Sequence, residues 1–289
     1  MKFHRVYIEI TDICGLSCSF CTTQPANRTM SLEHFELIIS QVKDYTQEVA
    51  LHMMGDPLVL SNLKEYLEIL QRHKLRAFIT TSGYYTAKHH PTTLLHEATK
   101  QINISINSYN KNQNTLTLDE YLAPIFDLIE YKLSHNIDKF INLRLWNLDE
   151  SLSERAFNQS FFDRVSARFD ITLNSDEIYR QQPKNIRIAS KTLLHFDSYF
   201  EWPSLDNPIY GNGRCQGLSS HFGILSNGKV VPCCLDSQGV ITLGDITKEP
   251  LEEIFHSHKT KNIIDGFKKG IATEELCQKC SYKKRFDTP

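Results

Sequence analysis

Short apolar runs alternate with longer amphipathic stretches through the first 190 residues of the chain. Runs rich in β-branched and aromatic residues predict strands, and apolar residues spaced three and four apart predict the helices between them. The predicted strands span residues 5–10, 48–54, 76–81, 102–107 and 140–147. The predicted helices span residues 31–45, 62–73, 92–100, 117–136 and 153–169. A sixth strand is expected within residues 169–190.

This alternation is typical of βαβ units and therefore predicts an α/β fold with a parallel sheet. Five or six such units can form a doubly wound sheet or a partial barrel, and the pattern alone leaves both open. Residues 196–214 are rich in aromatic residues, Pro, Gly and Asn, which is typical of a connecting segment.

The last quarter of the chain has a different pattern. Residues 221–235 are predicted to form a hairpin that turns at Asn227-Gly228, a dipeptide that tolerates positive φ angles. One or two short helices are expected within residues 250–270. We therefore predict a core at residues 1–195, a connecting segment at 196–214 and a small C-terminal domain at 215–289.

The composition is that of an ordinary globular protein. Hydrophobic residues make up 40% of the 289 positions, and 32 Lys and Arg against 34 Asp and Glu leave a net charge of −2. No block of like charge or long apolar run is present, so neither nucleic acid nor a membrane is expected as a partner. The N-terminus lacks the apolar segment of a signal peptide, so a cytoplasmic location is expected.

The eight cysteines fall into two groups separated by nearly 200 residues without one. Reduced compartments disfavour structural disulfides, so such groups indicate metal or redox chemistry. In the first group, Cys14, Cys18 and Cys21 follow the first predicted strand. Three thiolates on a tight loop can bind three corners of a cubane iron–sulfur cluster and leave one iron open.

The spacing Cys14-x3-Cys18-x2-Cys21, with the aromatic Phe20 before the last cysteine, resembles the radical S-adenosylmethionine (SAM) superfamily. The alternative for this group is a structural zinc site, which would need a fourth local ligand. The resemblance implies a partial (β/α)6 TIM-like barrel, with a 4Fe–4S cluster and SAM bound at the C-terminal ends of its strands.

A second segment resembles the same superfamily at the end of the second predicted strand. Met54, Gly55, Asp56 and Pro57 are similar to its G-G-E-P motif, which implies that they hold the amino group of SAM. Met54 replaces the first glycine of that motif and Asp56 replaces its glutamate.

Polar residues on the next three strands complete the resemblance. Thr81 and Ser82, before Gly83, resemble a T-N-G turn near the cofactor. The positions of Ser105 and Asn107 imply contacts with the ribose, and Arg144 can pair with the cofactor carboxylate. The alternative for these positions is the ordinary polarity of strand ends.

Four cysteines of the second group suit one further metal site. Cys215, Cys233, Cys277 and Cys280, with Gly228 five residues before Cys233, resemble the shortened "Twitch" form of the SPASM domain. That resemblance implies an auxiliary 4Fe–4S cluster with four thiolate ligands, whereas a structural zinc site is the alternative.

Two further residues near this group are candidates for catalysis. The spare Cys234 could donate a hydrogen atom after the radical step, or nearby Asp236 could accept a proton. The alternative for Cys234 is an inert thiol beside a ligand.

Membership of the superfamily implies an enzyme that cleaves SAM reductively to a 5′-deoxyadenosyl radical and abstracts a hydrogen atom from its substrate. A peptide or protein side chain is the favoured substrate, with a small metabolite as the alternative. A flavodoxin- or ferredoxin-type protein would supply electrons. A non-catalytic iron–sulfur protein that transfers electrons or senses redox state is the competing hypothesis, supported by the altered M-G-D-P motif.

Overall fold

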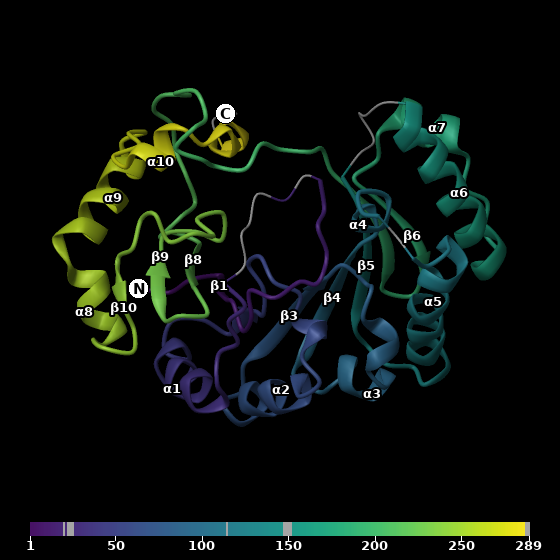
Figure 1. Ribbon diagram of the computed structural model, residues 1–289, viewed down its shortest axis with the longest axis horizontal. Coiled ribbons are helices and arrows are strands. Elements are labelled where there is room, and N and C mark those ends of the chain that lie inside the picture. Colours follow the sequence, from purple (N-terminus) through teal and green to yellow (C-terminus); the bar gives the residue numbers. More distant parts are fainter. Residues whose placement is uncertain (20, 22–25, 114, 147–151, 287–289) are drawn as a thin grey trace.

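A single curved sheet of ten strands organises the computed structural model, and the helices lie on its outer side (Figure 1). The structure describes residues 1–19, 21, 26–113, 115–146 and 152–286. The strand order is β10-β9-β8-β1-β2-β3-β4-β5-β7-β6. The strands are β1 (Arg5–Ile8), β2 (Glu48–Ala50), β3 (Arg76–Thr81), β4 (Thr99–Ser105), β5 (Phe140–Leu145), β6 (Asn185–Ala189), β7 (Thr192–Phe196), β8 (His221–Ile224), β9 (Lys229–Val231) and β10 (Gly244–Asp245).

Six of these strands, β1 to β5 and β7, are parallel neighbours, and the sheet does not close. This confirms the predicted partial (β/α)6 barrel. The sixth strand expected within residues 169–190 is present as β6, but the sixth parallel strand of the barrel is β7, which follows it. The strand within that window, β6, is antiparallel to β7 and forms the edge of the sheet. The sequence pattern of a strand is the same whether the strand runs parallel or antiparallel to its neighbour. Only the pairing shows that β7 is parallel to β5 and that β6 is antiparallel to β7.

Helices connect the parallel strands on the outer side of the sheet. They are α1 (Leu32–Val42), α2 (Leu63–Arg72), α3 (Pro91–Leu94), α4 (Asn107–Asn110), α5 (Leu118–Ser134), α6 (Leu152–Phe169) and α7 (Ser175–Gln181). The short 3-10 helices are η1 (Pro57–Val59), η2 (Thr86–Lys88) and η3 (Ser281–Phe286). None of the described helices is long and apolar enough to cross a bilayer.

Most of these helices follow from local signals. Ser31 caps α1 by accepting a hydrogen bond from the His34 N–H, and Thr117 forms a capping box with Glu120 at the start of α5. The predicted helix over 92–100 is wrong in extent, since α3 ends at Leu94 and β4 begins at residue 99.

The C-terminal quarter continues the same sheet. Strand β8 pairs in parallel with β1, and β8 and β9 form the predicted hairpin, in which Gly228 has a φ of +84°. Helices α8 (Leu251–His256), α9 (His258–Lys268) and α10 (Glu275–Gln278) follow it. The pairing of β8 with β1 therefore places the second cysteine group beside the first strand of the barrel.

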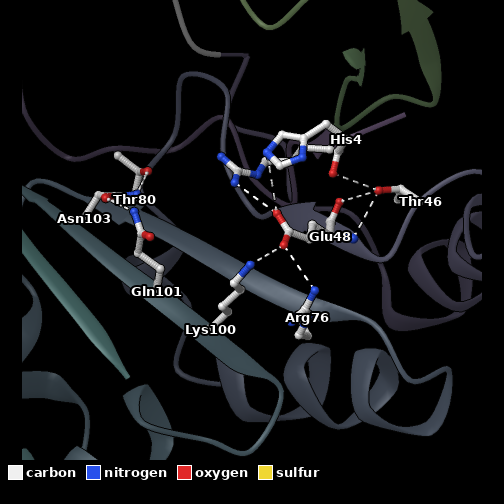
Figure 2. A network of polar contacts seen from close by, with 9 residues as sticks. His4, Thr46, Glu48, Arg76, Thr80, Lys100, Gln101 and Asn103 are labelled. Carbon is white, nitrogen blue, oxygen red and sulfur yellow. Dashed lines mark hydrogen bonds and ion pairs between the residues drawn. The ribbon is translucent and has the colours of Figure 1, made fainter. Parts of the chain in front are cut away.

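A charge cluster lies at the N-terminal ends of the barrel strands (Figure 2). The Glu48 carboxylate pairs with Arg5 at 3.1 Å, with Arg76 at 3.3 Å and with Lys100. Burial opposes the charge of Glu48, but hydrogen bonds from Lys100 and Arg5 outweigh it and hold the pKa of Glu48 below its ordinary value. This cluster anchors β1, β2, β3 and β4 to one another.

Candidate active site

A cavity of about 470 Å³ lies at the C-terminal ends of the barrel strands, between the barrel and the C-terminal segment. It collects nearly all of the site residues expected from the sequence. Those lining it are Cys14, Cys18, Cys21, Met54, Gly55, Asp56, Thr81, Ser82, Ser105, Asn107, Arg144, Cys215, Cys233, Cys234, Asp236, Cys277 and Cys280.

Two of the expected residues are not in this set. Pro57 is buried as the first residue of η1 and does not line the cavity. Phe20 lies outside the described residues.

The loop carrying the first three cysteines is held by Asn112, which follows α4. The Asn112 side chain accepts a hydrogen bond from the Ser17 N–H at 2.8 Å and donates one to Cys18 Sγ at 2.9 Å. Burial, together with smaller effects of Asp56, Cys18 and Cys21, raises the pKa of Cys14 to about 12. Three thiols on one short loop need positive charge to be deprotonated together, and iron would supply that charge. The loop therefore fits an iron–sulfur cluster.

The Asp56 carboxylate joins two loops of the barrel rim. Its Oδ1 accepts from the Leu58 N–H at 3.0 Å, while Oδ2 accepts from the Thr81 hydroxyl at 2.9 Å and from the N–H and hydroxyl of Ser82 at 2.8 and 2.6 Å. The Asp56 N–H also donates to the carbonyl of Ile13 at 3.0 Å, next to the first cysteine. Asp56 thus fixes the positions of the cysteine loop and the turn after β3.

Gly55 lies against the same cysteine loop. A Cβ on Gly55 would stand 2.0 Å from the Thr11 carbonyl oxygen, a contact that only backbone movement could relieve. Glycine is therefore required where the loop after β2 passes the segment that leads to Cys14.

Arg144 presents its guanidinium at the cavity wall, 4.4 Å from the centre of the Trp146 ring. Burial lowers the pKa of Arg144, and Asp197 opposes that shift. Asp197 itself pairs with Arg285 at 3.1 Å. The Arg144 charge is consequently available for an anionic group in the cavity.

The four C-terminal cysteines expected to bind metal form a second group on the far wall of the cavity. Burial raises the pKa of each thiol, and Cys215, Cys233 and Cys277 act on one another through their charges, as do Cys277 and Cys280. The buried Lys283 ammonium donates to the carbonyls of Cys277 at 3.0 Å and Cys280 at 2.7 Å. Its charge favours thiolates at Cys215 and Cys280.

Four thiols of this kind can bind either a 4Fe–4S cluster or one zinc ion. Within the described ranges, no three His, Cys, Asp or Glu side chains stand close enough together to hold one metal ion. Each thiolate around a cubane binds a different iron, so such ligands stand farther apart than four ligands around one zinc.

The two catalytic candidates differ in their surroundings. Both carboxylate oxygens of Asp236 accept backbone hydrogen bonds, from Val240 and Ile241 at 2.8 Å each, so Asp236 closes a turn. Burial raises the pKa of Cys234 to about 12, and a hydrogen bond from Tyr7 opposes that shift. The Cys234 thiol thus lies beside the phenol of a barrel strand.

Comparison with known protein families identifies the superfamily of this chain. The family model described as the Radical SAM superfamily matches residues 8–149. The chain belongs to the radical SAM superfamily. A second model, SPASM, an iron–sulfur cluster-binding domain, matches residues 215–281 of this radical SAM protein. No curated protein gives a significant match to the sequence.

Solved structures share the fold at low identity. BtrN, in complex with AdoMet and 2-DOIA, is 16% identical with a TM-score of 0.56, covering 97% of this chain and 94% of its own. Streptococcus suis SuiB bound to precursor peptide SuiA is 14% identical with a TM-score of 0.62, covering 100% and 74%. The protein anSMEcpe with bound AdoMet and Cp18Cys peptide is 15% identical with a TM-score of 0.53, covering 96% and 86%.

The superfamily and the SPASM domain together define the cofactors. This radical SAM enzyme uses SAM, a SAM-binding 4Fe–4S cluster and an auxiliary 4Fe–4S cluster. The ligand assignments for the individual cysteines remain predictions.

Sequence reasoning missed several residues that build the site. Asn112 and Tyr7 contact Cys18 and Cys234 from distant parts of the chain, whereas Lys283 donates to the nearby backbone carbonyls of Cys277 and Cys280. Lys283 is buried although it lies in a short run of basic residues near the C-terminus. No local signal marks Asn112 and Tyr7, because their partners come from distant elements.

Proposed function

We propose that this radical SAM enzyme cleaves SAM reductively and abstracts a hydrogen atom from a peptide or protein side chain or from a small metabolite. The observation that supports this most is the shared cavity, whose wall carries both cysteine groups and the cofactor-binding candidates. A substrate between the two groups would lie within reach of both cofactor sites.

When bound, the first cluster and SAM would supply a 5′-deoxyadenosyl radical, and the auxiliary cluster would supply an electron acceptor. In this proposal Cys14, Cys18 and Cys21 hold the first cluster, and Cys215, Cys233, Cys277 and Cys280 hold the second.

The remaining residues bind and orient SAM. Met54, Gly55 and Asp56 would surround its amino group through the loop after β2, while Arg144 pairs with its carboxylate. Thr81 and Ser82, on the rim, keep that loop in place through their bonds to Asp56.

Pro57 and Phe20 complete the cofactor-binding candidates, together with Ser105 and Asn107 at the end of β4. Ser105 and Asn107 line the cavity and are proposed to contact the ribose.

A peptide substrate has the broader support. Two of the three solved relatives above, SuiB and anSMEcpe, carry a peptide, and the third, BtrN, carries 2-DOIA. A cavity of about 470 Å³ fits one side chain or one small molecule beside the cofactor.

Cys234 is the stronger of the two candidates for acting on the substrate radical. Its thiol lines the cavity, whereas the carboxylate of Asp236 already accepts two backbone hydrogen bonds. Cys234→Ser and Asp236→Asn separate the two roles. We expect Cys234→Ser to change the product while SAM cleavage continues. If both variants form the same product as the wild type, neither residue acts on the substrate radical.

The electron donor is proposed to be a flavodoxin- or ferredoxin-type protein. Of the basic residues in η3, Lys283 is buried and Arg285 pairs with Asp197, which leaves the exposed Lys284 for contact with an acidic donor.

The test is anaerobic reconstitution followed by dithionite, SAM and measurement of 5′-deoxyadenosine. We expect 5′-deoxyadenosine and about eight irons per chain, four for each cluster. A fully loaded protein that forms none would favour the electron-transfer or redox-sensing alternative.

Paired variants provide the control. Cys14→Ala with Cys18→Ala should lose about four irons and all 5′-deoxyadenosine. Cys277→Ala with Cys280→Ala should also lose about four irons but keep SAM cleavage, because the first cysteine loop is untouched.

A further inference from the structure

A second cavity, of about 230 Å³, lies beneath the first on the inner face of the sheet, and we call it the inner chamber. On β4, Ser105 lines the upper cavity, whereas Asn103 and Gln101 line the inner chamber. Alternate residues of a strand share a face, so the inner chamber lies toward the N-terminal ends of the strands. Both cavities are lined by Thr80 and Arg144, so the chamber is an extension of the cofactor cavity.

Polar side chains form the walls of the inner chamber. The interior of a β/α barrel is normally filled by branched apolar residues. Here Gln101 Nε2 donates to Asn103 Oδ1 at 2.8 Å, and Asn142 Nδ2 donates to the same oxygen at 3.1 Å. Asn103 Nδ2 in turn donates to the Thr80 hydroxyl at 3.3 Å. These bonds fix the amide groups in one arrangement.

Four buried polar atoms in the walls have no hydrogen-bond partner among the described residues. They are Arg5 Nε, His52 Nδ1, Asn142 Oδ1 and His195 Nδ1. Asn142 is only 9% exposed. Unsatisfied buried atoms are few in native proteins, so their concentration around one cavity indicates a bound polar group.

The charge cluster around Glu48 adjoins the inner chamber through Arg5, the one member of the cluster that lines it. Glu48 pairs with three permanent cations, Arg5, Arg76 and Lys100, and three cations minus one carboxylate leave two positive charges in excess. Figure 2 shows this cluster beside the amide side chains of the chamber. Arg144 adds a further cation above, and the lining residues include no Asp or Glu.

We propose that the inner chamber binds a carboxylate of the substrate that has an O–H or N–H donor next to it. Arg5 and Arg144, the two cations that line the chamber, attract the carboxylate, while Asn142 Oδ1 accepts from the neighbouring donor. The two imidazoles can each donate or accept, and so match either group. A peptide C-terminus and a small hydroxy acid both have this chemistry.

The inference rests on the proposed function, because a substrate anchored here presents its adjacent carbons to the cofactor cavity above. It identifies the recognised end of that substrate, which the cofactor residues do not specify.

The test measures binding to the reconstituted protein with SAM present, by calorimetry at constant ionic strength. The probes are N-acetylglycine, for a peptide C-terminus, and glycolate, for a small hydroxy acid, each compared with neutral N-acetylglycinamide. We expect saturable binding of an acid, at least tenfold tighter than of the amide. The tighter acid identifies the source of the carboxylate. Equal binding of acid and amide, or no acid binding, would overturn the proposal.

Asn142→Asp is the decisive variant, because it keeps the side-chain shape and adds a negative charge. We expect it to weaken acid binding at least tenfold, and His195→Phe to weaken it as well. Thr99→Val is the matched control: Thr99 Oγ1 is also buried without a partner in the described chain but lines neither cavity. Its acid affinity should match that of the wild type.

Two readouts keep this test separate from the proposed function. Circular dichroism and iron content show that each variant is folded and loaded. Undiminished acid affinity in a folded Asn142→Asp protein overturns the chamber proposal. If the wild type binds the acid but forms no 5′-deoxyadenosine, the proposed function is refuted and the chamber proposal is not.

Discussion

Replacing Asp56 by alanine is expected to loosen the rim of the barrel. The carboxylate is 2% exposed and accepts four hydrogen bonds, from Leu58, Thr81 and Ser82. Each bond to a charged group contributes about 1.5–3 kcal/mol. Burial works against this gain, since it raises the pKa of Asp56. We therefore expect a loss of about 4 kcal/mol, the size found when a buried charged network is broken.

Asp56→Glu separates a structural role from a cofactor-binding role. The extra methylene moves the carboxylate away from its donors on Leu58 and Ser82 and overfills the site, at a cost of about 2 kcal/mol. Glutamate is nevertheless the residue of the G-G-E-P motif. If Asp56 acted mainly on the amino group of SAM, the glutamate variant would bind SAM at least as well as the wild type.

Thermal unfolding of the anaerobically reconstituted protein measures both changes. At about 2 °C per kcal/mol for a chain of this size, the alanine variant should melt roughly 8 °C lower. SAM affinity is measured by calorimetry on the same samples. A glutamate variant that is as stable as the wild type and binds SAM more tightly would refute the reasoning.

Three further changes test other parts of the site. Gly55→Ala should abolish iron binding at the first site, because its Cβ would stand 2.0 Å from the Thr11 carbonyl oxygen. The control is Gly211→Ala, whose Cβ would lie in open space. It should lower the free energy of unfolding by only about 1 kcal/mol and keep the iron. Burial raises the pKa of Glu9 from 4.5 to about 7, so the free energy of unfolding should fall as pH rises through that interval. Glu9→Gln should remove about 3 kcal/mol of this pH dependence. A Glu9→Gln protein whose urea unfolding has the same pH profile as the wild type would contradict this. Lys283→Met should lower the iron content of the auxiliary site only, since it removes the charge beside those thiols, and full iron loading would count against that role.

Much of the fold could be predicted from local patterns. Strand β3 spans the predicted residues 76–81, and the buried residues of α1 and α2 follow the predicted helical spacing. These elements are determined locally, by caps and by apolar periodicity. The order of β6 and β7 could not be predicted, because it depends on which edge each strand pairs with.

The candidate site also contains residues that could be predicted from the sequence and residues that could not. The spacing Cys14-x3-Cys18-x2-Cys21 was sufficient to predict the superfamily, because a tight loop of thiolates is itself a cluster-binding element. Asn112 and Lys283, which hold the two cysteine groups, are ordinary polar residues in the sequence. The role of Asn112 arises from a contact across the fold, and that of Lys283 from its burial and its bonds to the carbonyls of Cys277 and Cys280.

The sequence by itself therefore determined the kind of chemistry, since cysteine spacing and strand-end motifs are short-range features. Only the tertiary structure decided that both cysteine groups share one cavity, because that depends on β8 pairing with β1. It also decided that the barrel interior is polar and positively charged. That property comes from residues on five different strands, which are far apart in the chain and meet only when the parallel sheet forms.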